Sequence, residues 1–503
     1  MIPLYTPLQV RMMDERAFER GVAPLDLMER AAGHLARGIV GLAGAGYGLR
    51  AVLLCGNGNN GGDGLAAARR LLDAGAQPTV WLVGAESDLG ADAAVQLRRW
   101  RETGGRVVAQ SPEAALATAD IAVDCLLGTG AAGPPRGRYG EAVAAINAFG
   151  GPVAACDIPT GVDADSGAVP GDAVRADLTV TLGGHKRGLH IWPARDYAGW
   201  IVLGDLGIVE PADEPVAQVV EARDLAWLLP PPPSEGEDKR DRGVVVILAG
   251  SADMIGAGVL AARGAMAAGA GLVTLATSER ARPLIAPSIP EALTVALPDD
   301  DAAAAFDRLA AALEGADVLA LGPGLGRAPA TAELVRRVVR EVALPLVVDA
   351  DGINVFRGDA DALADHAAPL LVLTPHIREL GRLVGETDVW DRRVELLPQW
   401  AKSWASVIVA KGPASIVAAP DGRVWVNSTG GPALATGGTG DVLTGMTAAL
   451  LAQRGSPETV AAAVALHGLA GAAAADRLTA RSVTALDVAA AIPTALSSVE
   501  QRR

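Results

Sequence analysis

In the first half of the chain, short apolar runs alternate with longer segments whose apolar positions recur at helical spacing. Apolar runs of this length are typical of strands buried on both faces of a parallel sheet, and they occur at Ala51–Cys55, Thr79–Val83, Ile121–Cys125, Val153–Cys156 and Leu178–Leu182. Between them, the amphipathic pattern predicts helices at Leu65–Ala74 and Ala91–Trp100. Strands that alternate with helices in this way predict a doubly wound α/β domain.

The second half repeats this alternation. Strands are predicted at Val244–Leu248, Leu272–Ala276, Val318–Leu321, Leu346–Asp349, Leu370–Thr374 and Val407–Ala410. Helices are predicted at Gly256–Ala268, Ala302–Leu313, Asp441–Gln453 and Thr459–Ala475. No short repeat relates the two halves, so we expect two different α/β domains, each with three α/β/α layers.

A proline-rich segment separates the two patterns. Four consecutive prolines, Pro230 to Pro233, precede the charged run Glu235 to Arg242. Prolines in succession favour an extended conformation and cannot continue a helix. We therefore expect the domain boundary between about Pro211 and Arg242, with domains at residues 1–215 and 225–503.

Composition narrows the class of protein. The 503 residues carry a formal net charge of −15, which argues against a nucleic acid as partner. The three cysteines cannot build a disulfide framework, and we interpret them as small buried side chains. The first residues lack a signal-peptide pattern, and no apolar run has the length and composition of a membrane span. We expect a cytoplasmic protein without a membrane partner. Its high apolar content with few aromatics favours a homo-oligomer.

A loop rich in glycine and asparagine, Gly56 to Gly64, follows the first buried strand and leads into a helix. It contains G-x-G-x-x-G, which is compatible with a dinucleotide pyrophosphate at a helix N-terminus and also with a simple glycine-rich turn. Its three asparagines and one aspartate favour a binding role, because amides read polar groups and their oxygens ligate hard cations.

Two further loops leave strand ends of the same predicted sheet, at 124–130 and 156–163. Since loops at the carboxyl ends of parallel strands build the site in open α/β sheets, we expect Asn60, Asp124, Asp157 and Thr160 to converge. Oxygen donors without suitably spaced His or Cys favour a hard ion, K⁺ or Mg²⁺, over zinc. A local capping role for Asp157 or Asp163 is the alternative.

These motifs occur in the order Leu27–Gly33, Gly56–Gly64, 124–130, Cys156–Gly161 and Gly183–Gly188. Over residues 1–215 the chain resembles the YjeF N-terminal family of NAD(P)H-hydrate epimerases, with a Rossmann-like fold. The resemblance implies a K⁺ site at Asn60, Asp124 and Thr160. It implies that the hydrated dinucleotide is bound by Asn59, Asn60, Gly61, Gly62, Asp63, Gly128, Thr129, Gly130, Ala131, Ala132, Gly133, Pro134 and Asp157.

Inversion of the hydroxyl-bearing C6 of the hydrated nicotinamide requires loss and return of the hydroxyl, or ring opening. Either route needs a general acid/base, and we predict Asp157 for this role. Lys186 is either a second acid/base or electrostatic partner, or a contact to solvent or phosphate.

In the second domain, the run Ala435 to Gly445, with Gly437-Gly438-Thr439-Gly440-Asp441, precedes an apolar helix. Glycine N–H groups at a helix N-terminus bind anions, and Asp441 beside them is placed to take a proton from a hydroxyl that attacks a phosphoryl group. A structural cap is the alternative for Asp441. The sequence lacks the P-loop pattern G-x-x-x-x-G-K-[ST].

Four other motifs accompany this run: Gly322–Gly326, Asp349–Asn354, Thr374–Leu380 and Lys411–Ser415. Together with 249–258, they resemble the ribokinase-like superfamily, and most closely its ADP-dependent NAD(P)H-hydrate dehydratase branch, over residues 225–503. Two departures from that branch are Asp238-Lys239-Arg240 in place of His-Lys-Gly and Met254-Ile255 in place of an aromatic residue.

The resemblance implies ADP with Mg²⁺, and two sets of contacts. The nucleotide is assigned to Lys411, Gly412, Pro413, Ala414, Ser415 and Gly440. The hydrated dinucleotide is assigned to Ala257, Gly324, His376 and Asp441, with Asp441 as the base. For His376, a place in the core is the alternative.

The leading interpretation is a bifunctional metabolite-repair enzyme that epimerises NADHX and NADPHX and dehydrates the S form. The first rival is a ribokinase-like kinase for a vitamin or sugar with a non-catalytic nucleotide-binding first domain. A second rival makes the first domain a binding module or an NAD-dependent oxidoreductase domain. The epimerase-like motifs argue against both rivals.

Overall fold

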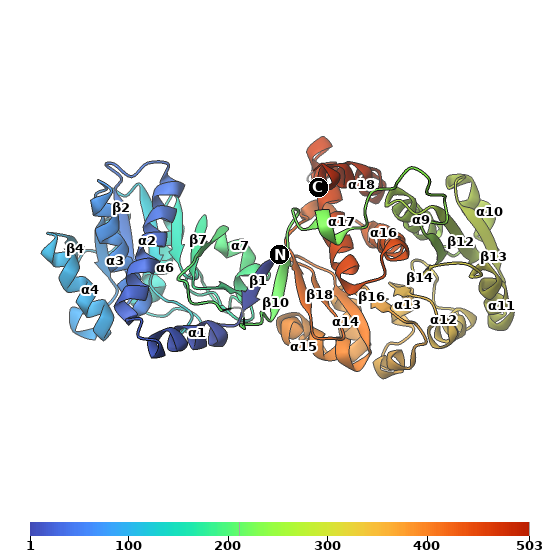
Figure 1. The fold of residues 1–503 in the computed structure, drawn as a ribbon, viewed down its shortest axis with the longest axis horizontal. Coiled ribbons are helices and arrows are strands. Elements are labelled where there is room, and N and C mark those ends of the chain that lie inside the picture. Colours follow the sequence, from blue (N-terminus) through green and yellow to red (C-terminus); the bar gives the residue numbers. More distant parts are fainter. Residues whose placement is uncertain (211, 502–503) are drawn as a thin grey trace. The chain divides into compact units, whose positions relative to one another are not determined.

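The computed structural model describes residues 1–210 and 212–501, which form two compact units (Figure 1). The first unit is Ile2–Ala217, and the second is Met1 with Gln218–Arg503. Pro211, where the predicted boundary region begins, lies outside the described residues. Pro230 to Pro233 lie inside the second unit because the strand β10 (Ala217–Val220), which precedes them, pairs with a strand near residue 425.

The first unit is built on a parallel sheet whose predicted strands are all confirmed. The central strands are buried at every position and mostly apolar, because helices cover both faces of the sheet. The sheet has the order β4-β3-β2-β5-β6-β7-β9. Its strands are β2 (Ala51–Cys55), β3 (Thr79–Leu82), β4 (Arg106–Val108), β5 (Ile121–Cys125), β6 (Val153–Cys156), β7 (Leu178–Leu182) and β9 (Trp200–Gly204).

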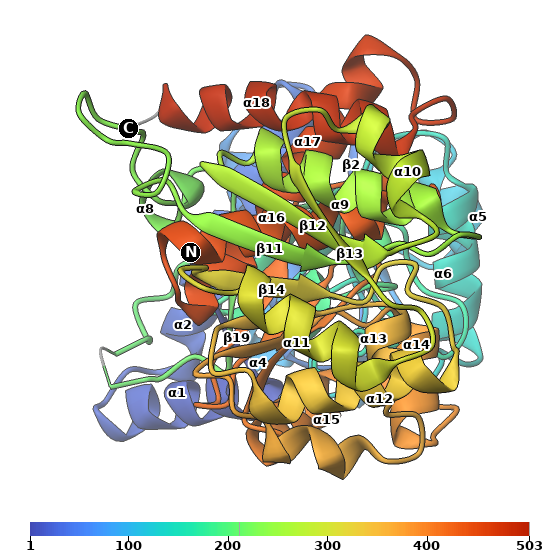
Figure 2. The same cartoon turned by 90° about the vertical axis from the view of Figure 1, so that its right-hand side faces the viewer.

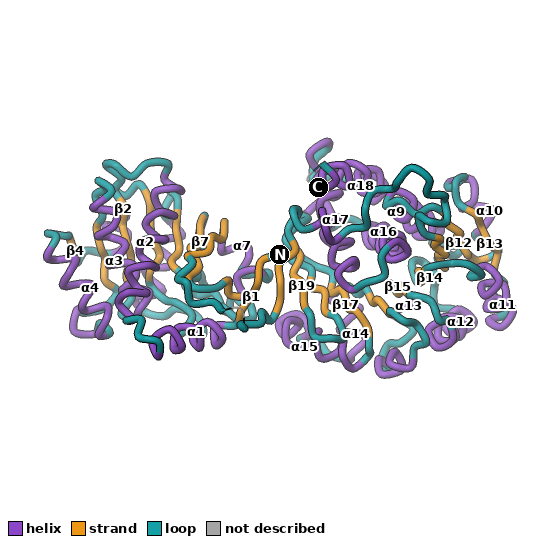
Figure 3. The backbone as a smooth tube through the Cα atoms, in the orientation of Figure 1, coloured by secondary structure: helices purple, strands orange, loops and turns teal. Residues whose placement is uncertain are grey.

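Helices cover both faces of this sheet, as the tube in Figure 3 shows, and confirm the three-layer arrangement. One face packs against α2 (Pro24–Ala43), α3 (Asn59–Asp73) and α4 (Ala91–Glu102). The other packs against α5 (Pro112–Leu116) and α6 (Arg138–Ala148). The short helix α7 (Arg195–Ala198) precedes β9.

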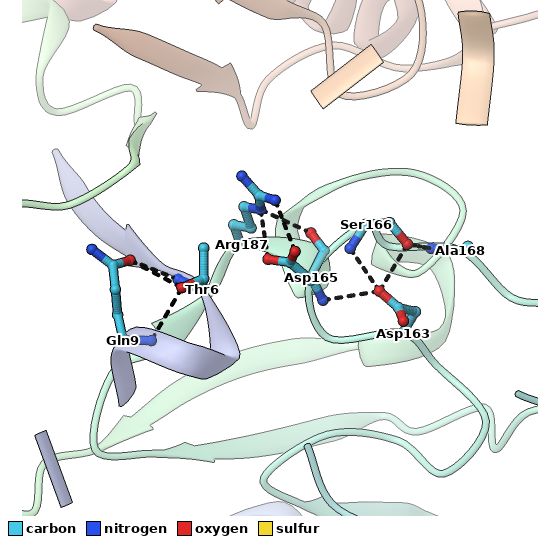
Figure 4. Close-up of polar contacts among 7 residues, drawn as sticks. All are labelled: Thr6, Gln9, Asp163, Asp165, Ser166, Ala168 and Arg187. Carbon is cyan, nitrogen blue, oxygen red and sulfur yellow. Dashed lines mark hydrogen bonds and ion pairs between the residues drawn. The ribbon is translucent and has the colours of Figure 1, made fainter. Parts of the chain in front are cut away.

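The chain begins with a strand and a helix that the apolar pattern did not predict. The strand β1 (Ile2–Tyr5) pairs with β8 (His185–Lys186), with Tyr5 opposite Lys186. The helix α1 (Pro7–Glu19) starts with a capping box in which the Thr6 hydroxyl accepts from the Gln9 N–H, and the Thr6 N–H donates to the Gln9 side chain (Figure 4).

The second unit has a larger sheet of the order β13-β12-β11-β14-β15-β16-β17-β18-β19-β10. Its pairs are parallel except for β17–β18 and β18–β19, which are antiparallel. Besides β10, the strands are β11 (Val244–Leu248), β12 (Leu272–Ser278), β13 (Leu293–Leu297), β14 (Val318–Leu321), β15 (Leu346–Val348), β16 (Leu371–Leu373), β17 (Ser406–Ala410), β18 (Ile416–Ala418) and β19 (Val424–Asn427).

Its helices lie on both faces of the sheet (Figure 2), so the second three-layer domain is also confirmed. One face carries α9 (Ile255–Ala267), α16 (Thr439–Gln453), α17 (Pro457–Arg477) and α18 (Ala485–Glu500). The opposite side in Figure 2 carries α11 (Ala302–Ala312), α12 (Pro329–Glu341), α14 (Ile377–Val384) and α15 (Val389–Ser403). Shorter helices are α8 (Leu225–Leu228), α10 (Arg282–Ile285) and α13 (Asp351–Asn354).

Glycines bring α9 and α16 into backbone contact. A Cβ atom at Gly445 would lie 1.8 Å from the Ala261 carbonyl oxygen, and one at Gly264 would lie 2.3 Å from the Val442 carbonyl oxygen. Only glycine allows this approach, which fixes the N-terminal end of α16 against α9.

Within residues 1–210 and 212–501, one helix, α17, is long and apolar enough to cross a membrane by length and composition, although its run of small residues did not suggest a span in the sequence. The structure buries 72% of its most apolar window inside the second unit. Burial of this kind is typical of a core helix.

Candidate active sites

A cavity of about 750 Å³ opens at the carboxyl ends of the strands of the first unit. Several predicted residues line it, namely Asn59, Asn60, Asp63, Gly128, Thr129, Gly130, Ala131, Asp157 and Lys186. They come from α3 and from the loops after β5, β6 and β7, as parallel strand ends require. Asp14 on α1 and Met28 on α2 complete the walls.

Asp157 lies directly after β6 and is bound to Lys186. Its Oδ1 accepts from the Leu182 N–H at 3.0 Å and from the Lys186 ammonium. The side chain of Lys186 is only 1% exposed, and its ammonium also donates to the Leu182 carbonyl oxygen. Asp157 has φ +65°, a left-handed conformation that aspartate tolerates better than most residues. Asp157 therefore presents a carboxylate to the cavity from a buried ion pair.

Asp124, Thr160 and Asn60 lie together behind the cavity. The buried Asp124 carboxylate accepts from the Thr160 N–H at 2.7 Å and from its hydroxyl at 2.8 Å. The Asn60 amide donates to the Leu127 carbonyl oxygen at 3.1 Å, which leaves its own oxygen as an acceptor. Burial raises the pKa of Asp124 to about 6, although the Thr160 bonds lower it.

A second feature of the cavity is its surplus of carboxyl groups. Asp14, Asp63 and Asp157 all interact electrostatically with Lys186 or with one another. Burial, with the Asp157 charge as a lesser cause, raises the pKa of Asp14 to about 6. Burial raises the pKa of Asp63 well above its usual value, reinforced by Asp157 and Asp14. Burial and mutual repulsion thus both favour the protonated forms of Asp14 and Asp63.

The predicted glycine loops divide into residues that line the cavity and residues that shape the backbone. Helix α3 begins at Asn59, so the predicted loop is shorter than expected and Asn59 to Asp63 form the first helical turns. Gly61 and Gly62 do not line the cavity. A Cβ at Gly61 would lie 1.9 Å from the Gly56 carbonyl oxygen, and one at Gly62 would lie 2.7 Å from the Met28 methyl group.

The remaining predicted loop residues lie apart from the main cavity. Ala132, Gly133 and Pro134 belong to an exposed stretch after Gly130. Gly133 instead lines a smaller cavity of about 250 Å³, with Gly128 and Ala131. The substrate contacts assigned to these residues, to Gly61 and to Gly62 stay predictions.

Asp163 has a structural role. Its Oδ1 accepts from the backbone N–H groups of Asp165 and Ser166, at 3.1 and 2.7 Å, and from the Ser166 hydroxyl (Figure 4). The Arg187 guanidinium binds the Asp165 side chain and carbonyl oxygen, so this turn is tied to the residue that follows Lys186.

All three cysteines are buried beneath the same strand ends. Cys55, Cys125 and Cys156 are free and fully buried in the first unit. A Cβ at Gly64 would lie 2.8 Å from the sulfur atoms of Cys55 and Cys125, so the thiols pack against α3. Among the described residues, no group of three His, Cys, Asp or Glu side chains suits a metal ion.

In the second unit, Asp441 lies in the first turn of α16. Gly438, with φ +89°, ends the loop before it. Burial raises the pKa of Asp441 to about 7, and the nearby Asp349 carboxylate contributes in the same direction. Lys411 lowers this pKa by its positive charge. Asp441 is therefore poised to exchange a proton near neutral pH.

Lys411 connects the predicted nucleotide loop to this helix. Its ammonium donates to Asp349 Oδ1 at 2.7 Å, and the Thr444 hydroxyl donates to Asp349 Oδ2 at 2.7 Å. A Cβ at Gly440 would lie 3.2 Å from the Lys411 nitrogen, so the ammonium lies at the N-terminus of α16. An ammonium and a helix N-terminus together favour a phosphate group.

The other predicted nucleotide residues form a turn after β17. The Ser415 hydroxyl donates to the Gly412 carbonyl oxygen at 2.9 Å, and Ala414 has φ +51°. Gly412 and Pro413 are exposed, and Ala414 and Ser415 are partly buried. This turn is open for a ligand beside Lys411.

His376 lies at the end of β16, next to Lys411. The two residues form an isolated parallel bridge. His376 Nδ1 accepts from the N–H groups of Arg378 and Glu379 and caps α14. Its side chain is 45% exposed, so the structure contradicts the core alternative, and burial of the rest lowers its pKa.

Ala257 and Gly324 lie against each other on the α9 side. A Cβ at Gly324 would be 2.7 Å from the Ala257 Cβ, and Gly324 has φ +63°. Gly322, with φ +126°, would place a Cβ 1.8 Å from the Asp349 carbonyl oxygen, so this loop and the start of α13 are in close backbone contact. These contacts leave room only for small residues.

Three residues of these sites were not among the predicted ones. Asp349 and Thr444 belong to motifs that the sequence shows, but their roles depend on tertiary contacts. Asp349 binds the Lys411 ammonium, and the Thr444 hydroxyl donates to Asp349. Asp14 belongs to no motif. The signal that could have found it is its position on the same helix face as the buried Val10, Met13 and Ala17.

Two family models match the chain, one in each unit. The model described as YjeF-related protein N-terminus matches residues 24–188. The model described as NAD(P)H-hydrate dehydratase matches residues 245–494. The first match includes Asp157 and Lys186, and the second includes Lys411 and Asp441.

Relatives of similar length share both regions. A Salinibacter ruber protein named bifunctional NAD(P)H-hydrate repair enzyme Nnr is 39% identical over 98% of this chain and 95% of its own. A Moorella thermoacetica protein of the same name is 38% identical over 90% of this chain and 88% of its own. The solved ADP/ATP-dependent NAD(P)H-hydrate dehydratase of Bacillus subtilis, co-crystallised with ATP and Mg²⁺, is 33% identical. It covers 56% of this chain and 99% of its own, with a TM-score of 0.49.

Proposed function

Because the chain belongs to the family of bifunctional NAD(P)H-hydrate repair enzymes, we propose that it repairs hydrated NADH and NADPH. The first unit interconverts the R and S forms, and the second unit dehydrates the S form at the expense of ADP. One observation supports this most. Each unit holds a carboxylate, Asp157 or Asp441, beside a glycine-containing helix start at the carboxyl ends of parallel strands.

In the first unit, Asp157 is the general acid/base at the hydroxyl of C6. Its pairing with Lys186 holds the carboxylate at a fixed place in the cavity wall. The N-terminus of α3 and the loop from Gly128 to Ala131 bind the dinucleotide phosphates through backbone N–H groups. A mobile carboxylate would lose the positional advantage that makes proton transfer efficient.

The oxygen donors behind the cavity fit a monovalent cation. Asp124 supplies one buried negative charge, and neutral oxygens of Thr160 and Asn60 lie beside it. These residues would hold K⁺. The bound cation would supply a positive charge that offsets the buried carboxylate and keeps the loop after β5 in place.

In the second unit, Asp441 takes the proton of the C6 hydroxyl. The hydroxyl oxygen then bonds to the terminal phosphorus of ADP, and the bond from that phosphorus to the AMP oxygen breaks. The C6–O bond of the resulting phosphate ester then breaks, phosphate leaves with the bonding pair, and loss of the C5 proton forms the ring double bond of NAD(P)H. Phosphate is the better leaving group, which is what the nucleotide contributes.

Lys411 and the N–H groups of Gly440 and its neighbours face the transferred phosphoryl group. Their positive charge stabilises the equatorial oxygens during transfer. Mg²⁺ would accompany the nucleotide, since this ion is usually bound by phosphate oxygens and few protein carboxylates. Two carboxylates near this place are Asp349 and Asp351, which both affect the pKa of Asp441.

A mixture of both epimers of hydrated NADH, with ADP and Mg²⁺, tests the proposal. The near-ultraviolet absorbance of reduced nicotinamide should return in full with the unchanged protein. Asp441→Asn should abolish the return and leave interconversion of the epimers intact, whereas Asp157→Asn should allow only the S share to return quickly. No return with the unchanged protein, or ADP-dependent phosphorylation of a vitamin or sugar instead, would overturn it.

A further inference from the structure

Helix α1 places one acidic side chain in the wall of the first-unit cavity. The capping box of Thr6 and Gln9 starts the helix, and Val10, Met13 and Ala17 bury its inner stripe. Asp14 follows Met13 on this stripe and lines the cavity. The segment lies before residues 24–188, which match the family model, and none of the sequence motifs includes it.

Asp14 and Asp157 differ in their bonding. Asp157 is fixed by the Leu182 N–H and the Lys186 ammonium. The Asp14 side chain is half-buried and forms no hydrogen bond or ion pair with any residue of the described chain. A carboxyl group that lines a cavity without a protein partner is available to a ligand.

We propose that Asp14 is the second catalytic residue of the epimerase. It exchanges a proton with the ring nitrogen N1, whereas Asp157 exchanges the proton of the C6 hydroxyl. This inference rests on the proposed function of the first unit. Epimerisation at a carbon that carries both nitrogen and hydroxyl needs a base and an acid at once, and the cavity offers Asp157 and Asp14 from two different elements.

Lys186 and Asp63 are less suited to this role. Lys186 already uses two of its three N–H donors on Asp157 and on the Leu182 carbonyl oxygen. Asp63 is buried, and burial, reinforced by Asp157 and Asp14, raises its pKa well above the usual range, which disfavours the charged form that a proton acceptor needs. Asp14 has a pKa of about 6 and both donates and accepts near neutrality.

Burial is the main cause of the raised pKa of Asp14, and the charged groups around it modify this pKa. Glu15 on the same helix and Asp157 across the cavity raise its pKa, and Lys186 lowers it. Asp63 is a further acidic neighbour, and Arg11 also lines the cavity. Burial has the largest effect.

The proposed step is a ring opening that balances without any oxidant. Asp157 accepts the proton of the C6 hydroxyl, and the electrons of that O–H bond form the C6 carbonyl. The C6–N1 bond breaks with its pair on N1, which takes the proton from Asp14. Rotation about C5–C6 presents the other carbonyl face. Return of both protons then closes the ring with inverted configuration.

The test uses the full chain with the purified R epimer of hydrated NADH and without ADP, so that the second unit cannot act. Chromatographic separation of the two epimers gives the rate of S formation. Asp14→Asn should lower kcat by about 10²- to 10³-fold with KM nearly unchanged, as expected for loss of one acid/base group. The limb of the pH–rate profile near pH 6 should vanish in this variant.

Two further variants make the result decisive. Asp14→Glu should regain part of the rate, because it restores a carboxyl group. Glu19→Gln, which changes an exposed residue of the same helix, should behave like the unchanged protein. Asp14→Asn should still dehydrate the S epimer with ADP at the normal rate, which shows that the second unit is intact, while the partial rate of Asp14→Glu shows that the first unit tolerates a change at this position.

Three results would overturn the proposal. They are an Asp14→Asn rate within twofold of the unchanged protein, a loss confined to KM, and an unaltered pH profile. If the unchanged protein neither epimerises nor dehydrates, the proposed function fails and not the assignment of Asp14 alone.

Discussion

The buried pair of Lys411 and Asp349 gives a quantitative prediction. Lys411→Met removes the ammonium and keeps most of the side-chain length. It leaves Asp349, whose side chain is 2% exposed, with the Thr444 hydroxyl as a remaining donor. An isolated charge in such a place is costly, so the second unit should lose stability as well as activity.

The distance sets the scale of this loss. At 2.7 Å and an effective dielectric constant of about 20, the direct attraction is about 6 kcal/mol. Much of this offsets desolvation, and removal of one partner from a buried pair costs about 3–5 kcal/mol. The Lys411 side chain is 20% exposed, so we expect the lower end. At about 2 °C for each kcal/mol, the second unit should melt roughly 6 °C lower.

Calorimetry of the full chain measures this shift, and the transition that ADP with Mg²⁺ raises belongs to the second unit. The double variant Asp349→Asn with Lys411→Met should recover most of the lost stability but not the activity. Lys402→Met, at an exposed lysine of α15, is the matched control. If Lys411→Met melts like this control, or if the double variant is no more stable than Lys411→Met, the reasoning about the buried charge is wrong.

Three other predictions concern Asp441, Asp124 and Gly445. Since Asp441 must be ionised to act and its pKa is about 7, the dehydration rate with saturating ADP should fall as the pH drops below about 7, and a flat profile would contradict this role. The pKa of Asp124 rises from 3.8 to about 6 on folding, so the first unit should lose stability as the pH rises from about 4 to about 6. In melting curves at neutral pH, KCl should restore this stability more than NaCl does. Gly445→Ala places a Cβ 1.8 Å from the Ala261 carbonyl oxygen and should cost about 1–3 kcal/mol in a denaturant titration, whereas Gly455→Ala, with its nearest neighbour at 3.7 Å, should be neutral.

The buried strands could be predicted because helices cover both faces of each sheet. A strand such as Val244–Leu248 then needs apolar side chains at every position, and the run is visible in the sequence. Helix α1 could not be predicted in the same way. Its inner stripe is short, and the exposed side chains of Leu8, Met12 and Phe18 blur the contrast between its faces.

The candidate site was predictable where one loop carries several functional residues, as at Asn59 to Asp63. The convergence of strand-end loops around Asn60, Asp124 and Thr160 was predictable too, but the specific side-chain pairs between elements were not. The ion pair of Asp157 and Lys186 depends on the register of β6 and β7, which places Asp157 beside Leu182 and the turn that leads to Lys186. The pairing of Asp349 with Lys411 depends on the order of strands in the second sheet, which local patterns do not determine.

The three buried thiols can report the opening of the first unit separately from that of the second. Cys55, Cys125 and Cys156 are the only cysteines of the chain, and all are inaccessible in the folded first unit. A thiol reagent added in a short pulse would therefore label the chain only when that unit opens, and opening of the second unit would leave no mark. Labelling rates measured beside the calorimetric transitions would assign each unfolding event to its unit without any engineered probe.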